Sequence, residues 1–386
     1  MQFIDLPTQQ KKIRSKIEDN IRAVLDHGQY IMGPEIGALE TRLADYVGAG
    51  HAIGCASGTD ALLLALMAYD VGPGDAIITT PFTFIATAEV ISLLGATPVF
   101  ADIDPKTYNI DPIRLEKTIM ALISEGSPDI PIPQPLIMNA PKPKGIIAVD
   151  LFGLPADYDR INAIAAEHGL FVIEDAAQSF GAVYRGKRSC SLGNISCTSF
   201  FPAKPLGGYG DGGMCFTNDS GLDEIMRSLR VHGQGRDKYD NVRIGINGRL
   251  DTLQAAILLA KFDIFDEEIA LRQEVAGLYN RYFEATGVLT APYVPSDCQS
   301  AWAQYSLLSK DSQSRTMYQE KLKKEGVPTA IYYPKPLHLQ EAFAHLGYKQ
   351  GAFPVTEDCA SRIFSLPMHP YLTTKDQERI CKACIS

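Results

Sequence analysis

The N-terminal stretch of the chain carries apolar residues at helical spacing. Over residues 9–27 this spacing predicts an amphipathic helix. Its expected apolar face consists of Ile13, Ile17, Ile21, Val24 and Leu25. Gly28 predicts the end of this helix, and a second helix is expected over Ile36–Val47.

From about residue 50 the pattern changes to short apolar runs that alternate with helical segments. The runs predicted as strands are Ala52–Cys55, Ala76–Thr79, Pro98–Asp102, Ile146–Val149 and Phe171–Glu174. The helices predicted among them are Thr59–Tyr69, Ile85–Leu94 and Tyr158–Glu167. Short strands that are apolar on both faces and interleaved with helices indicate an α/β fold. Its sheet is expected to be mostly parallel and covered on both sides.

The pattern becomes mainly helical after about residue 218. Leu253–Glu268 predicts a long helix that continues toward Tyr282. The last hundred residues mix strands and helices, which predicts a smaller α+β domain. Its expected elements are a strand over Ala303–Leu308 and helices over Gln319–Glu325 and Ala360–Phe364. We therefore expect a large domain over residues 1–255 and a smaller one over residues 256–386.

Residues 124–144, SEGSPDIPIPQPLIMNAPKPK, interrupt the α/β alternation. They contain six prolines between Pro128 and Pro143. Proline removes a backbone donor and disfavours regular structure, so this segment predicts an extended excursion on the surface.

Composition and charge narrow the class of protein. Hydrophobic residues make up 46% of the 386 residues and charged residues 21%, which is ordinary for a soluble globular protein with a substantial core. The net charge of -9 and the lack of a long basic run argue against a nucleic-acid partner. The chain has no signal-peptide pattern and no apolar run near the length of about 20 residues that spans a membrane. We expect a cytoplasmic protein without a membrane partner.

The eight cysteines are scattered through the chain and show no dense framework, so we expect free thiols. Cys381 and Cys384 form one CxxC near the C-terminus. A structural zinc site needs four ligands, and no second pair accompanies this one. We therefore expect no metal site.

The first candidate for chemistry is Ala56-Ser57-Gly58-Thr59-Asp60-Ala61, between a predicted strand and a predicted helix. Backbone N–H groups at a helix N-terminus bind anions, and small residues let a phosphate approach closely. Ser57 or Thr59 could add a hydroxyl donor. Plain helix capping by Ser or Thr explains the same letters, so this motif predicts a phosphate site only in the company of others.

The second candidate is the pair Glu174-Asp175 at the end of the predicted strand from Phe171. Ligands of doubly wound sheets bind outside the carboxyl ends of the strands. An acidic side chain there can pair with a protonated pyridine nitrogen. The alternative is that Asp175 caps the following helix.

The third candidate is Lys204, in Ser199-Phe200-Phe201-Pro202-Ala203-Lys204-Pro205-Leu206-Gly207-Gly208-Tyr209-Gly210-Asp211-Gly212-Gly213. A lysine that forms a Schiff base must be partly desolvated and held rigidly. The dense glycines allow close backbone approach. An isolated lysine would be read as a surface turn residue. The order of phosphate loop, strand-end acid and lysine matches the three ends of pyridoxal phosphate (PLP): phosphate, ring nitrogen and aldehyde.

On these residues the sequence resembles the DegT/DnrJ/EryC1/StrS sugar aminotransferases. The resemblance runs from Phe3-Ile4-Asp5-Leu6 to Ser365-Leu366-Pro367-Met368-His369-Pro370. It implies an aspartate-aminotransferase-like fold (PLP fold type I), with a large mixed, mostly parallel sheet domain and a smaller C-terminal α+β domain. It also implies pyridoxal 5'-phosphate as the cofactor and glutamate as the amino donor.

The resemblance implies a role for each matched residue. Lys204 is expected to form the Schiff base and to shuttle the proton, and Asp175 to pair with the pyridine nitrogen. Gln178 is expected to contact the ring hydroxyl region, and Phe84 to stack on the ring. The expected phosphate ligands are Gly58, Thr59 and Ser199.

The resemblance further implies an obligate homodimer with shared active sites. Asn247, in Ile246-Asn247-Gly248-Arg249-Leu250-Asp251, is expected to reach the phosphate bound by the neighbouring subunit.

The motif from Pro202 to Gly213 resembles members that act at sugar C3. Its flanking residues are most similar to enzymes that aminate UDP-2-acetamido-2-deoxy-3-oxo-glucuronate for the 2,3-diacetamido-uronic acids of surface polysaccharides. Arg249 then becomes the candidate for the sugar carboxylate, because a planar guanidinium suits a bidentate partner. The alternative for Arg249 is a structural arginine at the dimer interface.

Two positions depart from these relatives. Tyr332-Tyr333-Pro334 stands where His-Tyr-Pro is usual, so Tyr332 and Tyr333 are candidate sugar contacts with altered chemistry. Asp150 stands where Ser or His is commoner. A dTDP-3-oxo-6-deoxyhexose therefore stays open as the substrate. A non-catalytic PLP-fold binding or regulatory protein is the alternative from another class, but the joint presence of Lys204, Asp175, Gln178, Ser199 and Asn247 argues against it.

Overall fold

The computed structural model describes residues 1–123, 130–137 and 142–385. Its α-helices are α1 (Leu6–His27), α2 (Pro34–Val47), α3 (Gly58–Ala68), α4 (Ala86–Leu93), α5 (Pro112–Ile123), α6 (Gln134–Ile137), α7 (Tyr158–His168), α8 (Ser220–Leu229), α9 (Thr252–Phe262), α10 (Phe265–Thr286), α11 (Ser312–Lys324), α12 (Pro354–Arg362) and α13 (Thr374–Ile385). Short 3-10 helices cover Leu151–Gly153 (η1), Leu337–Leu339 (η2) and Glu341–Leu346 (η3).

The strands are β1 (His51–Cys55), β2 (Asp75–Thr79), β3 (Thr97–Phe100), β4 (Lys142–Val149), β5 (Phe171–Asp175), β6 (Val183–Tyr184), β7 (Lys187–Arg188), β8 (Ile195–Ser199), β9 (Gly213–Thr217), β10 (Cys298–Gln299), β11 (Tyr305–Leu308) and β12 (Ile363–Leu366).

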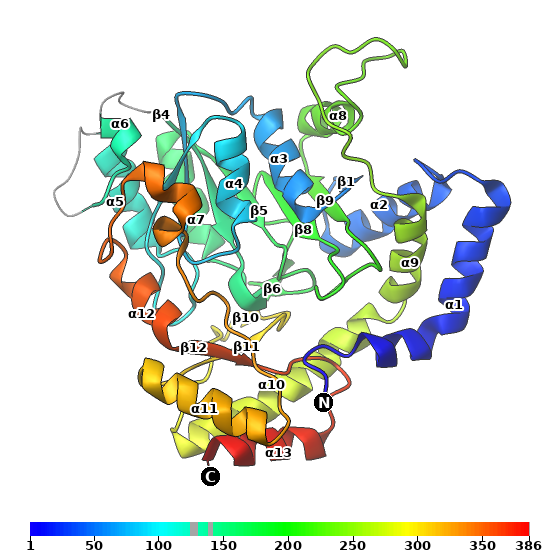
Figure 1. The fold of residues 1–386 in the computed structure, drawn as a ribbon. Coiled ribbons are helices and arrows are strands. Elements are labelled where there is room, and N and C mark those ends of the chain that lie inside the picture. Colours follow the sequence, from blue (N-terminus) through cyan, green and yellow to red (C-terminus); the bar gives the residue numbers. More distant parts are fainter. Residues whose placement is uncertain (124–129, 138–141, 386) are drawn as a thin grey trace.

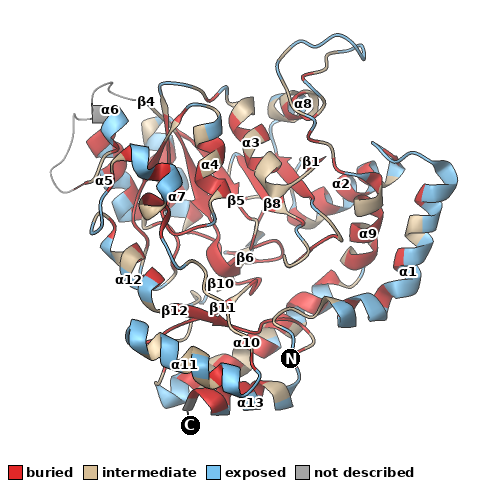
Figure 2. Ribbon diagram, viewed as in Figure 1, coloured by how far each residue is buried: buried red, intermediate tan, exposed pale blue. Residues whose placement is uncertain are grey.

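A seven-stranded sheet forms the centre of the molecule, in the order β1-β9-β8-β5-β4-β2-β3. Neighbouring strands from β8 to β3 are parallel, and β9 runs antiparallel to both β1 and β8. Helices surround the sheet, and its strands are buried (Figures 1 and 2). The predicted α/β class with a mixed, mostly parallel sheet is confirmed.

The C-terminal part packs below this sheet around the two-stranded sheet of β11 and β12 (Figure 1). A separate core cluster fills it, with Tyr279, Tyr305 and Phe364 fully buried. The proposed division at residue 255 falls inside α9, whose residues Ala255 and Leu258 belong to a core cluster of the large sheet. That boundary stays a prediction.

Helix α1 ends at Gly28, as predicted, because Gly28 adopts the left-handed conformation with φ 70°. Leu25 is an exception to the predicted apolar face, since it is 55% exposed while the neighbouring Val24 is buried. Successive helical residues point in directions about 100° apart, and Leu25 falls outside the buried stripe of α1. Most of α1 is exposed along one side of the molecule (Figure 2).

Two predicted helices differ in the structure. The long helix predicted from Leu253 toward Tyr282 is two helices, α9 and α10, which meet at Asp263 and Ile264. Three acidic residues open α10, and acidic side chains stabilise a helix N-terminus rather than its middle. The helix predicted over Ala360–Phe364 instead ends at Arg362, because Ile363 and Phe364 begin the buried strand β12. Their apolar spacing fits either element.

The proline-rich segment is more ordered than predicted where the structure describes it. Gln134–Ile137 forms a helical turn, and β4 already begins at Lys142. Pro143 is tolerated in β4 because the register with β2 shifts there, beside Ala76. The rest of the predicted excursion, residues 124–129 and 138–141, lies outside the described residues.

Candidate active site

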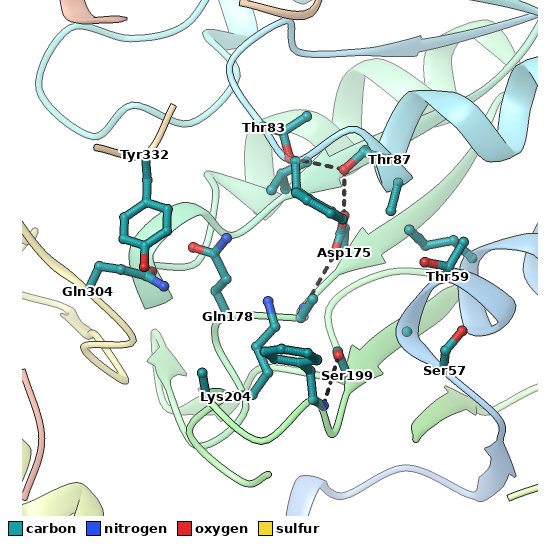
Figure 3. A pocket seen from close by; sticks show the side chains of 18 of the residues that line it. Ser57, Thr59, Thr83, Thr87, Asp175, Gln178, Ser199, Lys204, Gln304 and Tyr332 are labelled. Carbon is teal, nitrogen blue, oxygen red and sulfur yellow. Dashed lines mark hydrogen bonds between the residues drawn. The ribbon is translucent and has the colours of Figure 1, made fainter. Parts of the chain in front are cut away.

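The largest concentration of candidate residues lines a cavity of about 460 Å³. Three of the residues lining it, Val149, Asp175 and Ser199, are the last residues of the parallel strands β4, β5 and β8. The carboxyl edge of a doubly wound sheet is where such folds bind ligands. Figure 3 shows Lys204 and Asp175 near the middle of this cavity, with Ser57 and Thr59 on one side and Tyr332 and Gln304 on the other.

The N-terminus of α3 forms one end of the cavity. Ser57 caps this helix by accepting a hydrogen bond from the Asp60 N–H at 3.0 Å, so the capping interpretation is right for Ser57. The N–H groups of Gly58 and Thr59 have no acceptor within a helix that begins at Gly58. A Cβ on Gly58 would lie 2.6 Å from the Ser199 Cβ, so only glycine lets this helix end meet β8. The arrangement creates an anion cradle of backbone N–H groups and the Thr59 and Ser199 hydroxyls.

Asp175 lies deeper in the cavity. Its Oδ2 accepts a hydrogen bond from the Thr87 hydroxyl at 2.8 Å, and its Oδ1 accepts one from the Ala177 N–H at 3.3 Å. Burial raises the pKa of the Asp175 carboxyl, while these hydrogen bonds and the Lys204 charge lower it. A buried carboxylate of this kind gains from a cationic partner such as a protonated ring nitrogen.

Lys204 is held on a tight loop after β8. Its backbone N–H donates to the Phe201 carbonyl at 2.9 Å, and Gly207 lies so close that a Cβ there would be 2.6 Å from the Pro202 carbonyl oxygen. Burial lowers the pKa of the Lys204 amine, and the nearby Asp175 raises it. Among the described residues, no group accepts a hydrogen bond from this amine. A lysine with these properties is available as a nucleophile.

Gln178 is fixed on both sides of its amide. Its Oε1 accepts a hydrogen bond from the Phe152 N–H at 2.7 Å, and its Nε2 donates to the Tyr333 hydroxyl at 3.2 Å. The rings of Tyr333 and Phe84 lie 6.3 Å apart, and Phe84 is 54% exposed. A flat ligand that lies between Lys204 and Phe84 would therefore meet an aromatic face.

The structure thus brings Lys204 together with most of the other predicted site residues. Those residues are Gly58, Thr59, Phe84, Asp175, Gln178, Ser199, Tyr332 and Tyr333. The roles assigned to them stay predictions, but the cradle, the buried acid and the buried amine fit the phosphate, ring nitrogen and aldehyde of PLP. Two observations support this fit: Gly58 lies so close to Ser199 that a larger residue would clash, and the Lys204 amine has no hydrogen-bond partner in the described chain.

Asn247 and Arg249 lie elsewhere. They line a second cavity of about 410 Å³ with Ile31 and Gln254, and Asp211 borders both cavities. The Nε of Arg249 is buried without a hydrogen-bond partner in the described chain. These two residues therefore do not meet Lys204 of their own chain in the main cavity.

The residues of the main cavity that sequence reasoning missed include Ile4, Thr87 and Gln304. Thr87 lies three residues after Phe84, at the start of α4, and its N–H donates to the Phe84 carbonyl at 3.3 Å, so its closeness in sequence to Phe84 could have revealed it. Ile4 and Gln304 come from opposite ends of the chain, and no local pattern marks either of them.

Over the described ranges, no group of three or more His, Cys, Asp or Glu side chains could hold a metal ion. No helix in the described part of the chain is both long enough and apolar enough to span a membrane.

Comparison with known proteins gives consistent matches. The model of the DegT/DnrJ/EryC1/StrS aminotransferase family matches residues 11–385. A protein of Pseudomonas aeruginosa described as UDP-2-acetamido-2-deoxy-3-oxo-D-glucuronate aminotransferase is 51% identical over 383 residues, covering 99% of each chain.

Two solved structures agree with this match. A DegT DnrJ EryC1 StrS aminotransferase from Brucella abortus is 48% identical with a TM-score of 0.93, covering 100% of this chain and 98% of its own. The protein NtdA from Bacillus subtilis with bound cofactor PMP is 27% identical with a TM-score of 0.86, covering 99% and 82% of the two chains.

Proposed function

The chain belongs to the DegT/DnrJ/EryC1/StrS aminotransferase family, and we propose that it transfers an amino group from glutamate to C3 of UDP-2-acetamido-2-deoxy-3-oxo-glucuronate. It is a PLP-dependent sugar aminotransferase. The observation that carries the proposed chemistry is the unpaired, buried Lys204 amine in the same cavity as Asp175 and the Gly58 cradle. The choice of sugar is supported by the full-length relative that acts on it.

The bound cofactor supplies an aldehyde that condenses with amines and a pyridine ring that accepts an electron pair from the adjacent carbon. Gly58, Thr59 and Ser199 anchor its phosphate through backbone N–H groups and hydroxyls. Asp175 keeps the ring nitrogen protonated, and Thr87 holds the Asp175 carboxylate in place at 2.8 Å.

Lys204 performs two tasks in this proposal. As a neutral amine it binds the cofactor aldehyde, and its lowered pKa increases the neutral fraction. Once glutamate has replaced it at the aldehyde that the cofactor supplies, the freed Lys204 amine would accept the proton of the glutamate α-carbon and pass it on. In the second half of the reaction it delivers a proton to C3 of the sugar.

A homodimer would complete the site. The apolar residues Ile31, Met32, Tyr239, Val242 and Ile244 are between 42% and 88% exposed. A dimer interface that covers them would remove this apolar surface from water. Tyr239, Val242 and Ile244 lie on a loop that projects beyond α8, at the top of Figure 1. In a two-fold dimer, Asn247 would reach the phosphate of the other subunit and Arg249 the sugar carboxylate.

The test is a pair of half-reactions followed by the absorbance of the bound cofactor. Glutamate should abolish the band of the PLP-loaded protein, and the 3-keto-uronate should restore it. Restoration by a dTDP-3-oxo-6-deoxyhexose instead would replace the proposed sugar, and Arg249→Ala should then have no effect. No change on adding glutamate would contradict the proposed reaction.

A further inference from the structure

In the wall of the main cavity opposite the phosphate cradle, Gln304 and Ile4 have no assigned role, whereas their neighbour Tyr332 is a candidate sugar contact. This wall is formed by Gln304, Tyr332 and Ile4, and Figure 3 shows Gln304 beside Tyr332 on the far side of Lys204 from Ser57 and Thr59. A cofactor anchored at the cradle leaves this wall facing the second substrate. We propose that the Gln304 wall binds the acetamido group on C2 of the keto-sugar, next to the reacting C3; this proposal rests on the proposed function.

The backbone places Gln304 with little freedom. Its N–H donates to the Phe152 carbonyl at 3.4 Å, while the Phe152 N–H holds Gln178 at 2.7 Å. A Cβ on Gly153 would lie 2.8 Å from the Trp302 nitrogen and 3.1 Å from the Gln178 carbonyl oxygen. Gly153 has φ +101°, so a glycine is needed there on two counts. This close approach puts Gln304 next to Gln178.

The Gln304 amide is held in place but has no partner. Its Oε1 is buried, and neither end of the amide bonds to any other group in the described chain. A buried amide oxygen without a partner is rare in folded proteins, because the lost hydrogen bond costs free energy. A ligand amide would bond the Gln304 amide at the end that is open to the cavity, as donor or acceptor according to which way the side chain is turned.

The neighbours of Gln304 fit the rest of an acetamido group. Ile4 offers an apolar surface to the methyl, and its segment is fixed by the Met368 N–H donating to the Phe3 carbonyl at 3.3 Å. The rings of Phe3 and Tyr332 lie 6.4 Å apart and extend this apolar patch.

The charged parts of the proposed substrate do not fit here. Among the described residues that line the cavity, Lys204 is the sole basic side chain. In the proposed reaction its amine lies at the reacting carbon, so it is not free to bind a charged group of the sugar. A carboxylate or diphosphate would find no cation on the Gln304 wall. A small neutral group with one amide and one methyl fits best.

Binding of two unreactive ligands tests this proposal without turnover. UDP-2-acetamido-2-deoxyglucuronate and UDP-glucuronate differ only at C2, and titration calorimetry on the PLP-loaded protein gives a Kd for each. We expect wild type to bind the acetamido ligand at least about tenfold more tightly, which corresponds to one hydrogen bond plus a methyl contact. In Gln304→Ala this preference should fall to about twofold, and Ile4→Ala should reduce it severalfold.

Gln313→Ala is the matched control, because Gln313 is an exposed glutamine on α11 and should leave the ratio unchanged. Thermal unfolding of the PLP-loaded protein checks that Gln304→Ala folds as wild type does. An equal ligand preference in wild type and Gln304→Ala would overturn the proposal. If wild type itself fails to respond to glutamate, the proposed function fails, while the ratio of Kd values still reports on Gln304.

Discussion

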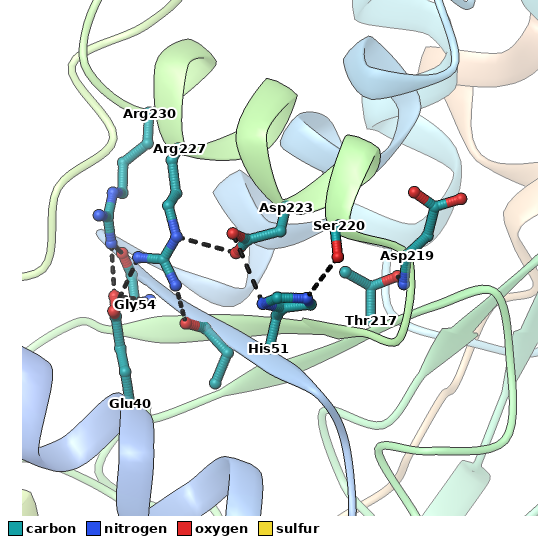
Figure 4. Close-up of polar contacts among 10 residues, drawn as sticks. Glu40, His51, Gly54, Thr217, Asp219, Ser220, Asp223, Arg227 and Arg230 are labelled. Carbon is teal, nitrogen blue, oxygen red and sulfur yellow. Dashed lines mark hydrogen bonds and ion pairs between the residues drawn. The ribbon is translucent and has the colours of Figure 1, made fainter.

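Two regions beside the central sheet bury polar or charged side chains, and they differ in how many hydrogen bonds those side chains make. In the first, around Lys204, the amine lacks a hydrogen-bond partner within the described chain and the Gln304 amide is unpaired. In the second, Glu40 of α2 accepts hydrogen bonds from the Gly54 N–H, from Arg230 and from Arg227 at 2.6–2.9 Å (Figure 4).

The Glu40 network extends until most of its groups are satisfied. Arg230 also donates to the Gly54 carbonyl at 2.7 Å, and Arg227 donates to Asp223 and to the Ala52 carbonyl. These contacts join α2, β1 and α8. Buried charge that is paired on nearly every side stabilises structure, whereas buried charge left unpaired is available for a ligand. The comparison therefore separates a structural network from a site by hydrogen-bond saturation.

The largest expected effect is on Lys204. Lys204→Ala should lower the rate of transamination by about 10⁴-fold or more, because it removes both the nucleophile and the proton carrier. It should not lower the melting temperature, since burial disfavours the charged amine that is removed. Steady-state rates and thermal unfolding measure the two quantities. Substantial remaining activity would show that the unpaired lysine is not the reacting one.

Asp175→Asn should have the next largest effect. It keeps the size of the side chain but removes the charge that pairs with the ring nitrogen, which we expect to lower kcat by about 10²–10³-fold. The protein should stay as stable as wild type, because burial raises the pKa of this carboxyl and so opposes its charged form. An Asp175→Asn protein that is less stable than wild type but keeps the wild-type kcat when folded would mean that Asp175 stabilises the fold instead.

Glu40→Gln should reverse that pattern. Removing the carboxylate leaves Arg230, whose side chain is 3% exposed, without its counter-charge, and this should lower the free energy of unfolding by about 3 kcal/mol. The rate of transamination per folded molecule should stay the same as in wild type. Urea unfolding measures the loss. Glu18→Gln, which breaks an exposed pair with Arg14, is the control and should change stability by less than about 1 kcal/mol.

Asp150 should give the smallest effect, visible only as a dependence on pH. Burial, and then the nearby Glu174, raise the pKa of the Asp150 carboxyl, although Ser179 and Tyr158 donate to it at 2.6 and 2.8 Å. A raised carboxyl pKa stabilises the fold at low pH, and this contribution is lost as pH rises through the folded-state pKa.

Asp150→Asn should therefore flatten the fall of stability toward high pH, by at most about 1.4 kcal/mol per pH unit. Urea unfolding over a range of pH checks this. An unchanged pH profile would mean that Asp150 remains charged in the fold.

The sequence predicted the reacting and cofactor-binding residues of the site better than the other residues that line the cavity. Gly58 and Lys204 follow a strand and Asp175 ends one, each in a recognisable motif, and the sheet brings such positions to one edge. Gln304 could not be found this way, because the approach of Trp302 to Gly153 places it there. Ile4 reaches the cavity only through its contacts with the C-terminal part of the chain.

The fold, too, could be predicted only where the pattern is local. The α/β alternation predicted the central sheet, but the antiparallel direction of β9 depends on its pairing with the distant strand β1 as well as with β8. The break between α9 and α10 was missed because the apolar period continues across it.

The most direct test of the account uses the second buried lysine as its internal control. Burial lowers the pKa of Lys261 to about 8, yet Lys261 lies over the Tyr209 ring, outside the main cavity and near Glu268. A lowered pKa alone would therefore select either lysine. Of these two lysines, Lys204 is the one that shares a cavity with the cradle and Asp175.

The PLP-loaded protein should be reduced with borohydride, digested, and the cofactor mass located by mass spectrometry. The account predicts the added mass on the peptide that contains Lys204, and its disappearance in Lys204→Ala. Cofactor found on Lys261, or retained covalently in Lys204→Ala, would contradict the assignment of the site.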